Sequence, residues 1–370
     1  MSLKEIFCQD RAISILQRAF AGDKSPHAYI FAGPEGVGKF KTAREWAKTL
    51  LCNNPAIENT FVDSCGLCVS CRLLEAGSHH DYNLVYKELV EFTKEGKGRK
   101  TPVEFPIDVV REFVVDKVSN KPILSQRKVF ILGEAEKLNT ESQNCLLKVL
   151  EEPPGYCTII LLCTRLERLL PTIKSRCQMI RFGPVTEEMI IERLREMRVK
   201  DKQARYWAHL AQGSLGRACQ WARLELVDGN LYEIKKRLLI SLSTCKYADA
   251  LELAGWILDE SKRIAAIWAD LDKDTSKADI NRRAQKTLVQ IIISALHDAM
   301  GFILDDRQKL INIDQKDQIR LLACRFNPEQ LAEIITLCYR TLRQIESSVN
   351  EKLIFEQLLL SLAVSDIINI

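Results

Sequence analysis

A glycine-rich segment ending in a lysine lies near the N-terminus, with the sequence Gly-Pro-Glu-Gly-Val-Gly-Lys-Phe at residues 33–40. Gly33, Gly38 and Lys39 occupy the fixed positions of the phosphate-loop pattern G-x-x-x-x-G-K-[ST]. Between a strand and a helix, such a loop cradles phosphates with backbone N–H groups, and its lysine neutralises their charge. The last position normally supplies a hydroxyl to Mg²⁺, but Phe40 has no oxygen. The segment therefore predicts a phosphate loop without one of its metal ligands.

A second metal ligand is missing further along the chain. An apolar strand pattern at 128–132 is followed by Gly133, where an aspartate would hold the metal. Glu134 stands where a water-polarising base would lie, but a base is of little use without a placed metal. Thr42 lies too far along the helix to be a simple substitute for a hydroxyl at position 40. We therefore expect Mg²⁺ to be poorly held. Whether ATP still binds is left open, because the loop could retain its shape for packing alone. The residues expected to contact phosphate are Gly33, Gly36, Gly38 and Lys39.

Four of the thirteen cysteines are close together in the sequence, namely Cys52, Cys65, Cys68 and Cys71. Tetrahedral Zn²⁺ prefers four soft ligands of this kind, and two consecutive C-x-x-C turns suit it. The spacing predicts a closed, structural zinc site rather than a redox pair, because three cysteines share one run. His79 and His80 lie nearby and could compete for the metal, although beginning or capping the next strand is the simpler role for them.

Two polar side chains follow apolar strand or helix patterns in the middle of the chain. Thr164 ends the run Leu-Leu-Cys-Thr, at the edge where a parallel sheet presents side chains to a ligand. Arg176 precedes another apolar strand in the sequence Ser-Arg-Cys. On residue types alone, Thr164 could simply end a strand, and Arg176 could simply pair with a carboxylate of its own domain.

The elements that must position these residues alternate in the first half of the chain between short apolar strands and helical patterns. This alternation predicts an α/β domain with a parallel sheet covered on both faces. The expected strands are 28–31, 83–85, 129–132, 158–163 and 179–182, with helices at 10–20 and 41–51 and an irregular insertion at 86–106. After the last strand we expect only helices. Apolar residues at helical spacing mark one of them, namely Ala284, Leu288, Ile291, Ile292, Ala295, Leu296 and Ala299. The expected domains are 1–183, 184–228 and 229–370.

Composition sets further bounds. The chain has 370 residues, 46% of them apolar and 28% charged, and a net charge of +4. That charge is too small to argue for nucleic acid, and we interpret the basic run at 94–100 as a solvated loop. No uninterrupted apolar stretch reaches the roughly 18 residues that a membrane helix needs. Because we expect no secretion signal, we expect the cysteines to be free thiols or metal ligands in a reducing cytoplasm.

Taken together, these motifs resemble the clamp-loader family of AAA+ proteins. The resemblance covers about residues 10–220 and rests on the phosphate loop, the four cysteines and several further runs. These are Glu-Ala-Glu-Lys-Leu-Asn at 134–139, Asn-Cys-Leu-Leu-Lys-Val-Leu-Glu-Glu-Pro-Pro at 144–154, Ser-Arg-Cys at 175–177 and Gly-Ser-Leu-Gly-Arg at 213–217. The resemblance implies a RecA-like sheet domain with an inserted zinc module, then a small helical lid and an all-α collar that oligomerises.

The resemblance also implies a function. Clamp-loader subunits form a ring or spiral that opens a sliding clamp and places it on primed DNA, beside the replicative polymerase. Some subunits do not hydrolyse ATP but donate the Ser-Arg-Cys arginine, here Arg176, to a neighbouring motor subunit. Thr164 matches the position that senses the γ-phosphate, and Arg217 matches the lid residue that reaches the bound phosphates. The implied partners are gamma/tau-like motor subunits, a delta subunit, the clamp and, through the complex, DNA.

Two other readings stay open. An active gamma/tau-like motor subunit could coordinate Mg²⁺ through Thr42, Glu134 or Glu136, and would hydrolyse ATP by itself. A zinc-dependent nucleic-acid-binding protein would need a basic surface and would show salt-dependent DNA binding as a lone chain.

Overall fold

The computed structural model describes residues 2–21, 26–95, 104–227, 229–272, 275–304, 310–347 and 350–364. It forms two compact units, and each is described by itself. Unit 1 comprises residues up to 186 together with 213–216, and unit 2 comprises 187–212 together with the chain from 217 onward.

Unit 1 is built on a five-stranded parallel sheet, as predicted. Its strands are β1 (Ala28–Ala32), β4 (Tyr82–Val85), β5 (Lys128–Leu132), β6 (Cys157–Cys163) and β7 (Gln178–Arg181). Their order across the sheet is β4-β5-β6-β1-β7, and every neighbouring pair is parallel. The central strands β1, β5 and β6 are buried at every residue, as expected for continuous apolar runs covered on both faces.

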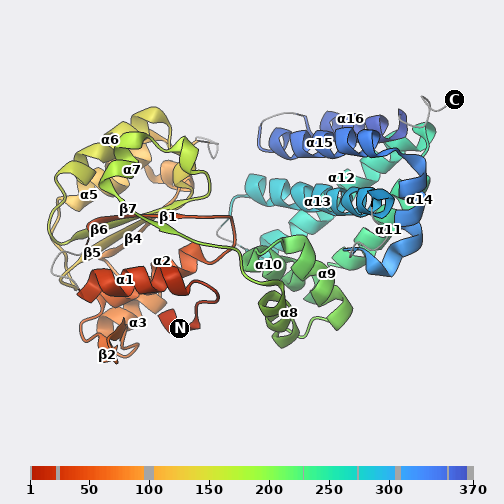
Figure 1. The fold of residues 1–370 in the computed structure, drawn as a ribbon. Helices are drawn as coiled ribbons and strands as arrows, with labels where there is room; N and C mark the ends of the chain where they lie inside the picture. Colours follow the sequence, from red (N-terminus) through yellow and green to blue (C-terminus); the bar gives the residue numbers. More distant parts are fainter. Residues whose placement is uncertain are drawn as a thin grey trace. The chain divides into compact units, whose positions relative to one another are not determined.

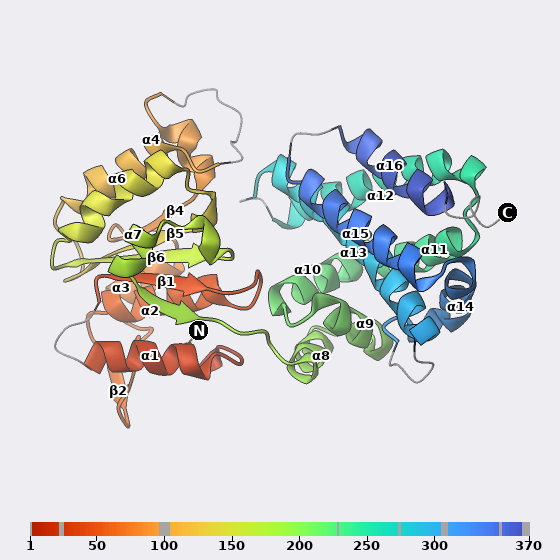
Figure 2. The same cartoon turned by 45° about the horizontal axis from the view of Figure 1, so that its top comes forward.

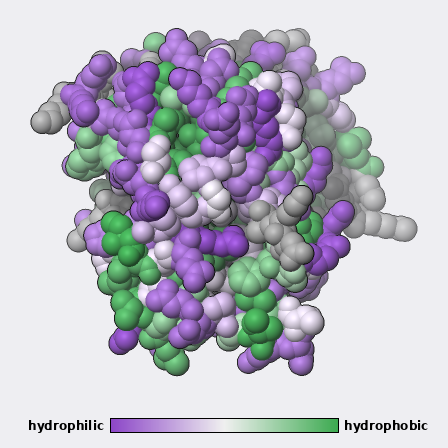
Figure 3. Space-filling view, turned by 90° about the vertical axis from the view of Figure 1, so that its left-hand side faces the viewer, coloured by the Kyte–Doolittle hydropathy of each residue, from purple (hydrophilic) through white to green (hydrophobic). Residues whose placement is uncertain are grey.

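Helices cover both faces of this sheet, as the views in Figures 1 and 2 show. One face packs against α1 (Asp10–Ala21), α2 (Lys39–Leu51) and α3 (Val69–Glu75), around Phe31 and Trp46. The other face packs against α4 (Ile107–Val110), α5 (Asp116–Val118), α6 (Thr140–Glu151) and α7 (Pro171–Arg176), around Phe105 and Phe130. A π-helical turn, Arg111–Val115, joins α4 to α5. The side of the molecule drawn in Figure 3 is largely hydrophilic, with separate hydrophobic groups.

The insertion expected at 86–106 is only partly described. It begins with a 3-10 helix, Lys87–Phe92, and its residues 96–103 lie outside the described residues, as does most of the basic run at 94–100.

A small hairpin and α3 form an insertion between α2 and β4. Strands β2 (Ala56–Glu58) and β3 (Phe61–Asp63) are antiparallel and joined by two residues with positive φ, Asn59 and Thr60, as a tight hairpin turn requires. The hairpin is held on α1 by Gln17, whose amide exchanges two hydrogen bonds with the backbone of Val62, at 2.7 and 2.8 Å.

Unit 2 is entirely helical within the described residues. Its helices are α8 (Glu187–Glu196), α9 (Asp201–Ala211), most of α10 (Leu215–Leu226), α11 (Leu231–Thr244), α12 (Ala250–Leu271), α13 (Lys277–Leu304), α14 (Lys316–Arg325), α15 (Pro328–Gln344) and α16 (Glu351–Val364). α15 begins with a capping box between Asn327 and Gln330, with proline in its first turn. The apolar face predicted for residues 284–299 is buried in α13.

α13 is also long and apolar enough to cross a membrane by length and composition, but 67% of its most apolar window is buried inside the protein. A buried core helix of a globular domain has the same properties.

The lid helices expected at 184–228 and the collar helices share one compact unit. An aromatic cluster joins them, in which Trp207 of α9 contacts Trp221 of α10 and Tyr232 of α11, with ring centroids 5.7 and 6.1 Å apart. Trp221 Nε1 also donates a 3.1 Å hydrogen bond to Thr287 Oγ1 of α13.

A buried ion pair lies beside this cluster. Lys235 Nζ is 2.6 Å from Asp314 Oδ1, and the side chains of these residues are 0% and 5% exposed. The ammonium also lies 4.6 Å from the ring centroid of Tyr206, and the Tyr232 hydroxyl donates to Asp314 Oδ2 at 2.9 Å. The pair therefore connects α9, through Tyr206, with α11.

Candidate functional site

The glycine-rich loop connects β1 to α2, as the phosphate-loop pattern predicts. Gly36 and Gly38 have φ of 75° and 104°, which favour glycine, and α2 begins directly after them at Lys39. Gly33 is required for packing, since a Cβ there would lie 2.4 Å from the backbone oxygen of Phe182. The Gly36 carbonyl accepts a 2.7 Å hydrogen bond from Gly216 N, at the start of α10.

Lys39 points back at its own loop. Its Nζ donates to the carbonyl oxygens of Gly33 and Pro34, at 2.6 and 2.5 Å. Burial lowers the pKa of Lys39, and the nearby Glu136 and Glu35 carboxylates oppose that shift. A bound phosphate would have to compete with two backbone carbonyls for this ammonium.

The positions that would hold Mg²⁺ offer no substitute oxygen from α2. The Phe40 side chain is 45% exposed, and Thr42 is fully buried with its hydroxyl donating to the Gly38 carbonyl at 3.0 Å. At Gly133, an added Cβ would meet only the Val85 carbonyl oxygen within 4 Å, at 3.9 Å. A Cβ at the place of the missing aspartate would therefore clash with nothing, whereas the Thr42 hydroxyl is already hydrogen-bonded within its own helix.

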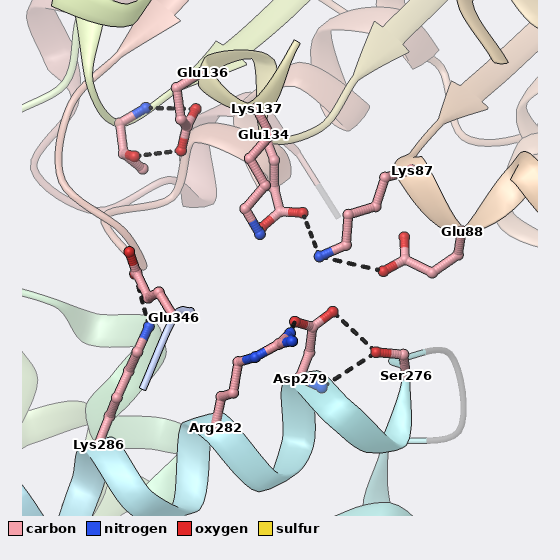
Figure 4. Close-up of polar contacts among 11 residues, drawn as sticks. Lys87, Glu88, Glu134, Glu136, Lys137, Ser276, Asp279, Arg282, Lys286 and Glu346 are labelled. Atoms are coloured by element: carbon pink, nitrogen blue, oxygen red, sulfur yellow. Dashed lines mark hydrogen bonds and ion pairs between the residues drawn. The ribbon is translucent and has the colours of Figure 1, made fainter. Parts of the chain in front are cut away.

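Glu134 is held by two lysines (Figure 4). One carboxylate oxygen pairs with Lys137, and the other lies 3.3 Å from Lys87 Nζ. The Lys87 side chain is 1% exposed and also lies 3.6 Å from a Glu88 oxygen. The Glu134 carboxylate thus serves to neutralise the buried ammonium of Lys87.

The two residues expected to sense a nucleotide also have partners within the chain. Thr164 donates to the Glu136 carboxylate from its hydroxyl and, at 3.1 Å, from its backbone N–H. Arg217 Nη2 donates to the Ala211 carbonyl of α9 at 3.3 Å. Both side chains therefore make contacts that do not depend on nucleotide.

Arg176 lies at the C-terminal end of α7 with its side chain 36% exposed. Its Nη2 lies 2.9 Å from Glu151 Oε1 at the end of α6, and its Nη1 donates to the Thr172 carbonyl at 3.1 Å. The next residue, Cys177, faces the core, and burial raises the pKa of its thiol to about 12. The arginine thus has a carboxylate partner in its own unit, yet much of its side chain is accessible.

The structure brings the four predicted zinc ligands together. The Sγ atoms of Cys52, Cys65, Cys68 and Cys71 all lie within 4.8 Å of one another, and Cys52 Sγ is 3.5 Å from that of Cys65 and 3.9 Å from that of Cys68. A tetrahedral ion with bonds of about 2.3 Å needs sulfurs about 3.8 Å apart. The arrangement fits Zn²⁺ in ligand number, ligand type and spacing.

Backbone N–H groups also point at these sulfurs. Cys65 N donates to Cys52 Sγ, Cys68 N to Cys65 Sγ and Cys71 N to Cys68 Sγ, at 3.3–3.4 Å. At Cys68, burial alone would raise the thiol pKa, but hydrogen bonds led by the Cys71 N–H lower it to about 6, whereas burial raises the pKa of the Cys52 and Cys71 thiols. Such donors favour the thiolate form that a metal binds.

His79 is not part of this cluster but connects the cysteine-bearing insertion to the sheet domain. The ring is 4% exposed; Nδ1 accepts from Asp81 N at 3.0 Å, and Nε2 lies 2.8 Å from Ser70 Oγ. The Ser70 hydroxyl in turn donates to the Leu51 carbonyl at the end of α2. Both ring nitrogens are therefore used within the fold.

Three participating residues were not singled out from the sequence. Glu151, Lys87 and Asp81 approach their partners only through the packing of separate elements. Asp81 accepts three backbone hydrogen bonds from residues 123–125, at 2.7–2.9 Å, which fixes the loop before β5. One signal was present for Glu151, because it lies in the Leu-Glu-Glu-Pro-Pro run already noted.

Comparisons with known proteins agree with this architecture. The family model described as "DNA polymerase III, delta subunit" matches residues 8–186, and that for its C-terminal part matches residues 277–363. The chain is 24% identical to the delta' subunit of DNA polymerase III from Bacillus subtilis over 354 residues, 96% of each chain. It is 42% identical to delta' of Pseudomonas aeruginosa over 151 residues, 41% of each chain. It is 28% identical to the tau subunit of Bacillus subtilis over 294 residues, 72% of this chain and 48% of that one.

The sheet order, the degenerate phosphate loop and the helical second unit define an AAA+ protein of the clamp-loader class. The chain belongs to the DNA polymerase III clamp-loader subunit family, which includes delta' and gamma/tau. Its likeness to a delta' subunit extends along almost the whole chain, whereas the match to Pseudomonas aeruginosa delta' spans less than half of that protein.

Proposed function

We propose that this chain is a delta'-like clamp-loader subunit that does not hydrolyse ATP and presents Arg176 to the nucleotide of a neighbouring gamma/tau-like motor subunit. With a delta subunit, this assembly opens the sliding clamp and places it on primed DNA in the cytoplasm. The proposal rests on a contrast between the residues that would act on this chain's own nucleotide and the arginine that would act on a neighbour's. The groups that would act on the chain's own nucleotide are absent or engaged, while the arginine suited to a neighbour's nucleotide is intact and partly exposed.

The chemistry supports this division. Phosphoryl transfer depends on a metal ion to neutralise developing charge. Phe40 and Gly133 supply no ligand, and Thr42 is bonded to its own helix. A guanidinium, by contrast, is permanently cationic and can make two parallel hydrogen bonds to a phosphate. Arginine fingers contribute about 10³–10⁵ in rate in related reactions.

The test compares ATP hydrolysis by the isolated chain with hydrolysis by a complex containing its cognate motor and delta subunits. We expect no turnover above background by the chain alone, and Arg176→Ala should lower clamp-stimulated hydrolysis and clamp loading without changing complex size. Exposed Arg181, in β7, provides a control variant for the loss of one positive charge, and Arg181→Ala should behave as the unmodified chain. Unchanged clamp loading by a correctly assembled Arg176→Ala complex would refute the role in trans.

The similarity to tau subunits favours one competing function, an active motor subunit. Robust ATP hydrolysis by the lone chain that disappears in Lys39→Ala would establish that function instead.

We further propose that Cys52, Cys65, Cys68 and Cys71 hold one structural Zn²⁺. Its role is to lock α2, the hairpin and α3 together. No position on the ion would remain open, because four thiolates complete its coordination.

A further inference from the structure

The contact between Arg176 and Glu151 suggests a role for Glu151, a residue to which neither the Ser-Arg-Cys motif nor the cysteine cluster assigns one. We propose that Glu151 is a positioning residue: it holds the Arg176 guanidinium in one orientation, ready for the nucleotide of the neighbouring subunit. This inference rests on the proposed function of Arg176 in trans.

The geometry holds the guanidinium from two sides. Glu151 Oε1 lies 2.9 Å from Nη2, and the Thr172 carbonyl accepts from Nη1 at 3.1 Å. The two partners come from the end of α6 and from within α7, so the arginine is fixed relative to both helices. A guanidinium carries five N–H groups, and these two contacts use only part of them. The remaining donors can bind a phosphate while Glu151 and Thr172 keep their places.

Exposure explains why such a support is needed. The Arg176 side chain is 36% exposed and that of Glu151 is 50% exposed, so no tight pocket restricts the arginine. A long side chain at a surface otherwise samples several staggered rotamers, and each freed torsion offers about three wells. A finger that is already oriented loses less conformational freedom when the neighbour's phosphate arrives. An exposed ion pair is also weak enough to adjust to that phosphate.

The test uses the assembled complex with Glu151→Ala, Glu151→Gln and Glu152→Ala in this chain. The motor subunits carry alanine at their own Ser-Arg-Cys arginine, so that only the site facing Arg176 keeps a finger. Glu151→Ala frees one or two torsions, so we expect kcat for ATP to fall by about 3- to 10-fold, with KM unchanged. Glu151→Gln retains a hydrogen-bond acceptor and should stay within about twofold of the unmodified complex. Glu152→Ala removes an adjacent exposed carboxylate and should leave kcat unchanged.

A double-mutant cycle separates this inference from the proposed function. If Glu151 acts through Arg176, Glu151→Ala should cause no further loss in an Arg176→Ala background. If Arg176→Ala lowers kcat for ATP but Glu151→Ala leaves it unchanged or raises it, Glu151 has no positioning role, and the role of Arg176 in trans still stands. The positioning role would also be refuted if Glu151→Ala lowers kcat further in the Arg176→Ala background. If Arg176→Ala itself has no effect, the proposed function fails, and the positioning role fails with it.

Discussion

Replacing Lys235 tests whether the buried ion pair beside the aromatic cluster stabilises unit 2. The Asp314 side chain is only 5% exposed, and Lys235 is its ion-pair partner. Lys235→Ala removes that cation and leaves the carboxylate buried, with the Tyr232 hydroxyl still donating to it. Breaking a buried pair from one side costs about 3–5 kcal/mol, because it leaves an uncompensated charge. We therefore expect the free energy of unfolding of this unit to fall by about that amount.

Tryptophan fluorescence during urea unfolding is a suitable assay. Of the five tryptophans, Trp46 lies in unit 1, while Trp207, Trp221, Trp256 and Trp268 lie in unit 2. The signal therefore reports mainly on the helical unit.

Two variants sharpen the interpretation. Removing both charges, in Lys235→Met with Asp314→Asn, should restore most of the stability, since a buried pair can often be replaced by neutral groups at little cost. Lys236→Met is the matched control, because Lys236 forms an exposed pair with Glu233 and should change stability by about 0.5 kcal/mol or less. A loss below about 1 kcal/mol in Lys235→Ala would refute the reasoning.

Acid gives an independent check on the same pair. Burial pushes the pKa of Asp314 up, but the hydrogen bonds and charge of Lys235, with the Tyr232 hydroxyl, bring it below its usual value. A carboxyl whose folded pKa is depressed adds stability that is fully present above its unfolded pKa, about 3.9, and is lost as the pH falls through the folded value. In Lys235→Met the lowering effect of Lys235 is gone, so burial raises the pKa of Asp314 and the variant gains stability as this carboxyl takes up a proton. The stability difference between the unmodified chain and Lys235→Met should therefore be largest near pH 7 and shrink steadily as the pH falls toward about 4.

Three further predictions concern unit 1. Metal analysis of chain produced with ample zinc should find one equivalent, and Cys71→Ser should lower the thermal stability of the zinc module; less than about a tenth of an equivalent would contradict the site. Phe40→Thr combined with Gly133→Asp should raise Mg²⁺-ATP affinity, measured by calorimetry, more than either change alone, because both missing ligands are then present and a Cβ at residue 133 clashes with nothing. Gly33→Ala should lower the free energy of unfolding by about 1–3 kcal/mol, since its methyl would lie 2.4 Å from the backbone oxygen of Phe182. An unchanged free energy of unfolding would show that the backbone after β7 can shift to make room for the methyl.

The sequence was most informative where a local pattern determines the structure. Continuous apolar runs placed the central strands β1, β5 and β6, because strands buried on both faces have no polar alternation. The outer strands β4 and β7 were predicted from shorter runs that include polar residues. The two C-x-x-C turns bring Cys65, Cys68 and Cys71 together through local geometry, and Cys52, which the sequence also predicted, joins them from the end of α2.

Contacts between separate elements could not be predicted in this way. The pairing of Arg176 with Glu151 depends on how the ends of α6 and α7 meet, and that of Glu134 with Lys87 on how the residues after β5 approach those after β4. The packing of α9 against α11 likewise arises from aromatic contacts between residues such as Trp207 and Tyr232, whose spacing shows no local period.

The packing of the phosphate loop bears on how such proteins are recognised from genomes. Gly33 lies against the β7 side of the sheet, and Gly36 accepts a hydrogen bond from the start of α10, so these glycines have a structural use without any ligand. Position 40, by contrast, faces solvent in part, and the packing of the loop does not depend on a hydroxyl there. A chain without ATPase activity, as proposed for this one, can thus keep most of the motif while losing its hydroxyl. A pattern search that weighs the glycines and lysine heavily would report an ATPase, and the residue after the lysine carries more information about catalysis than the glycines before it.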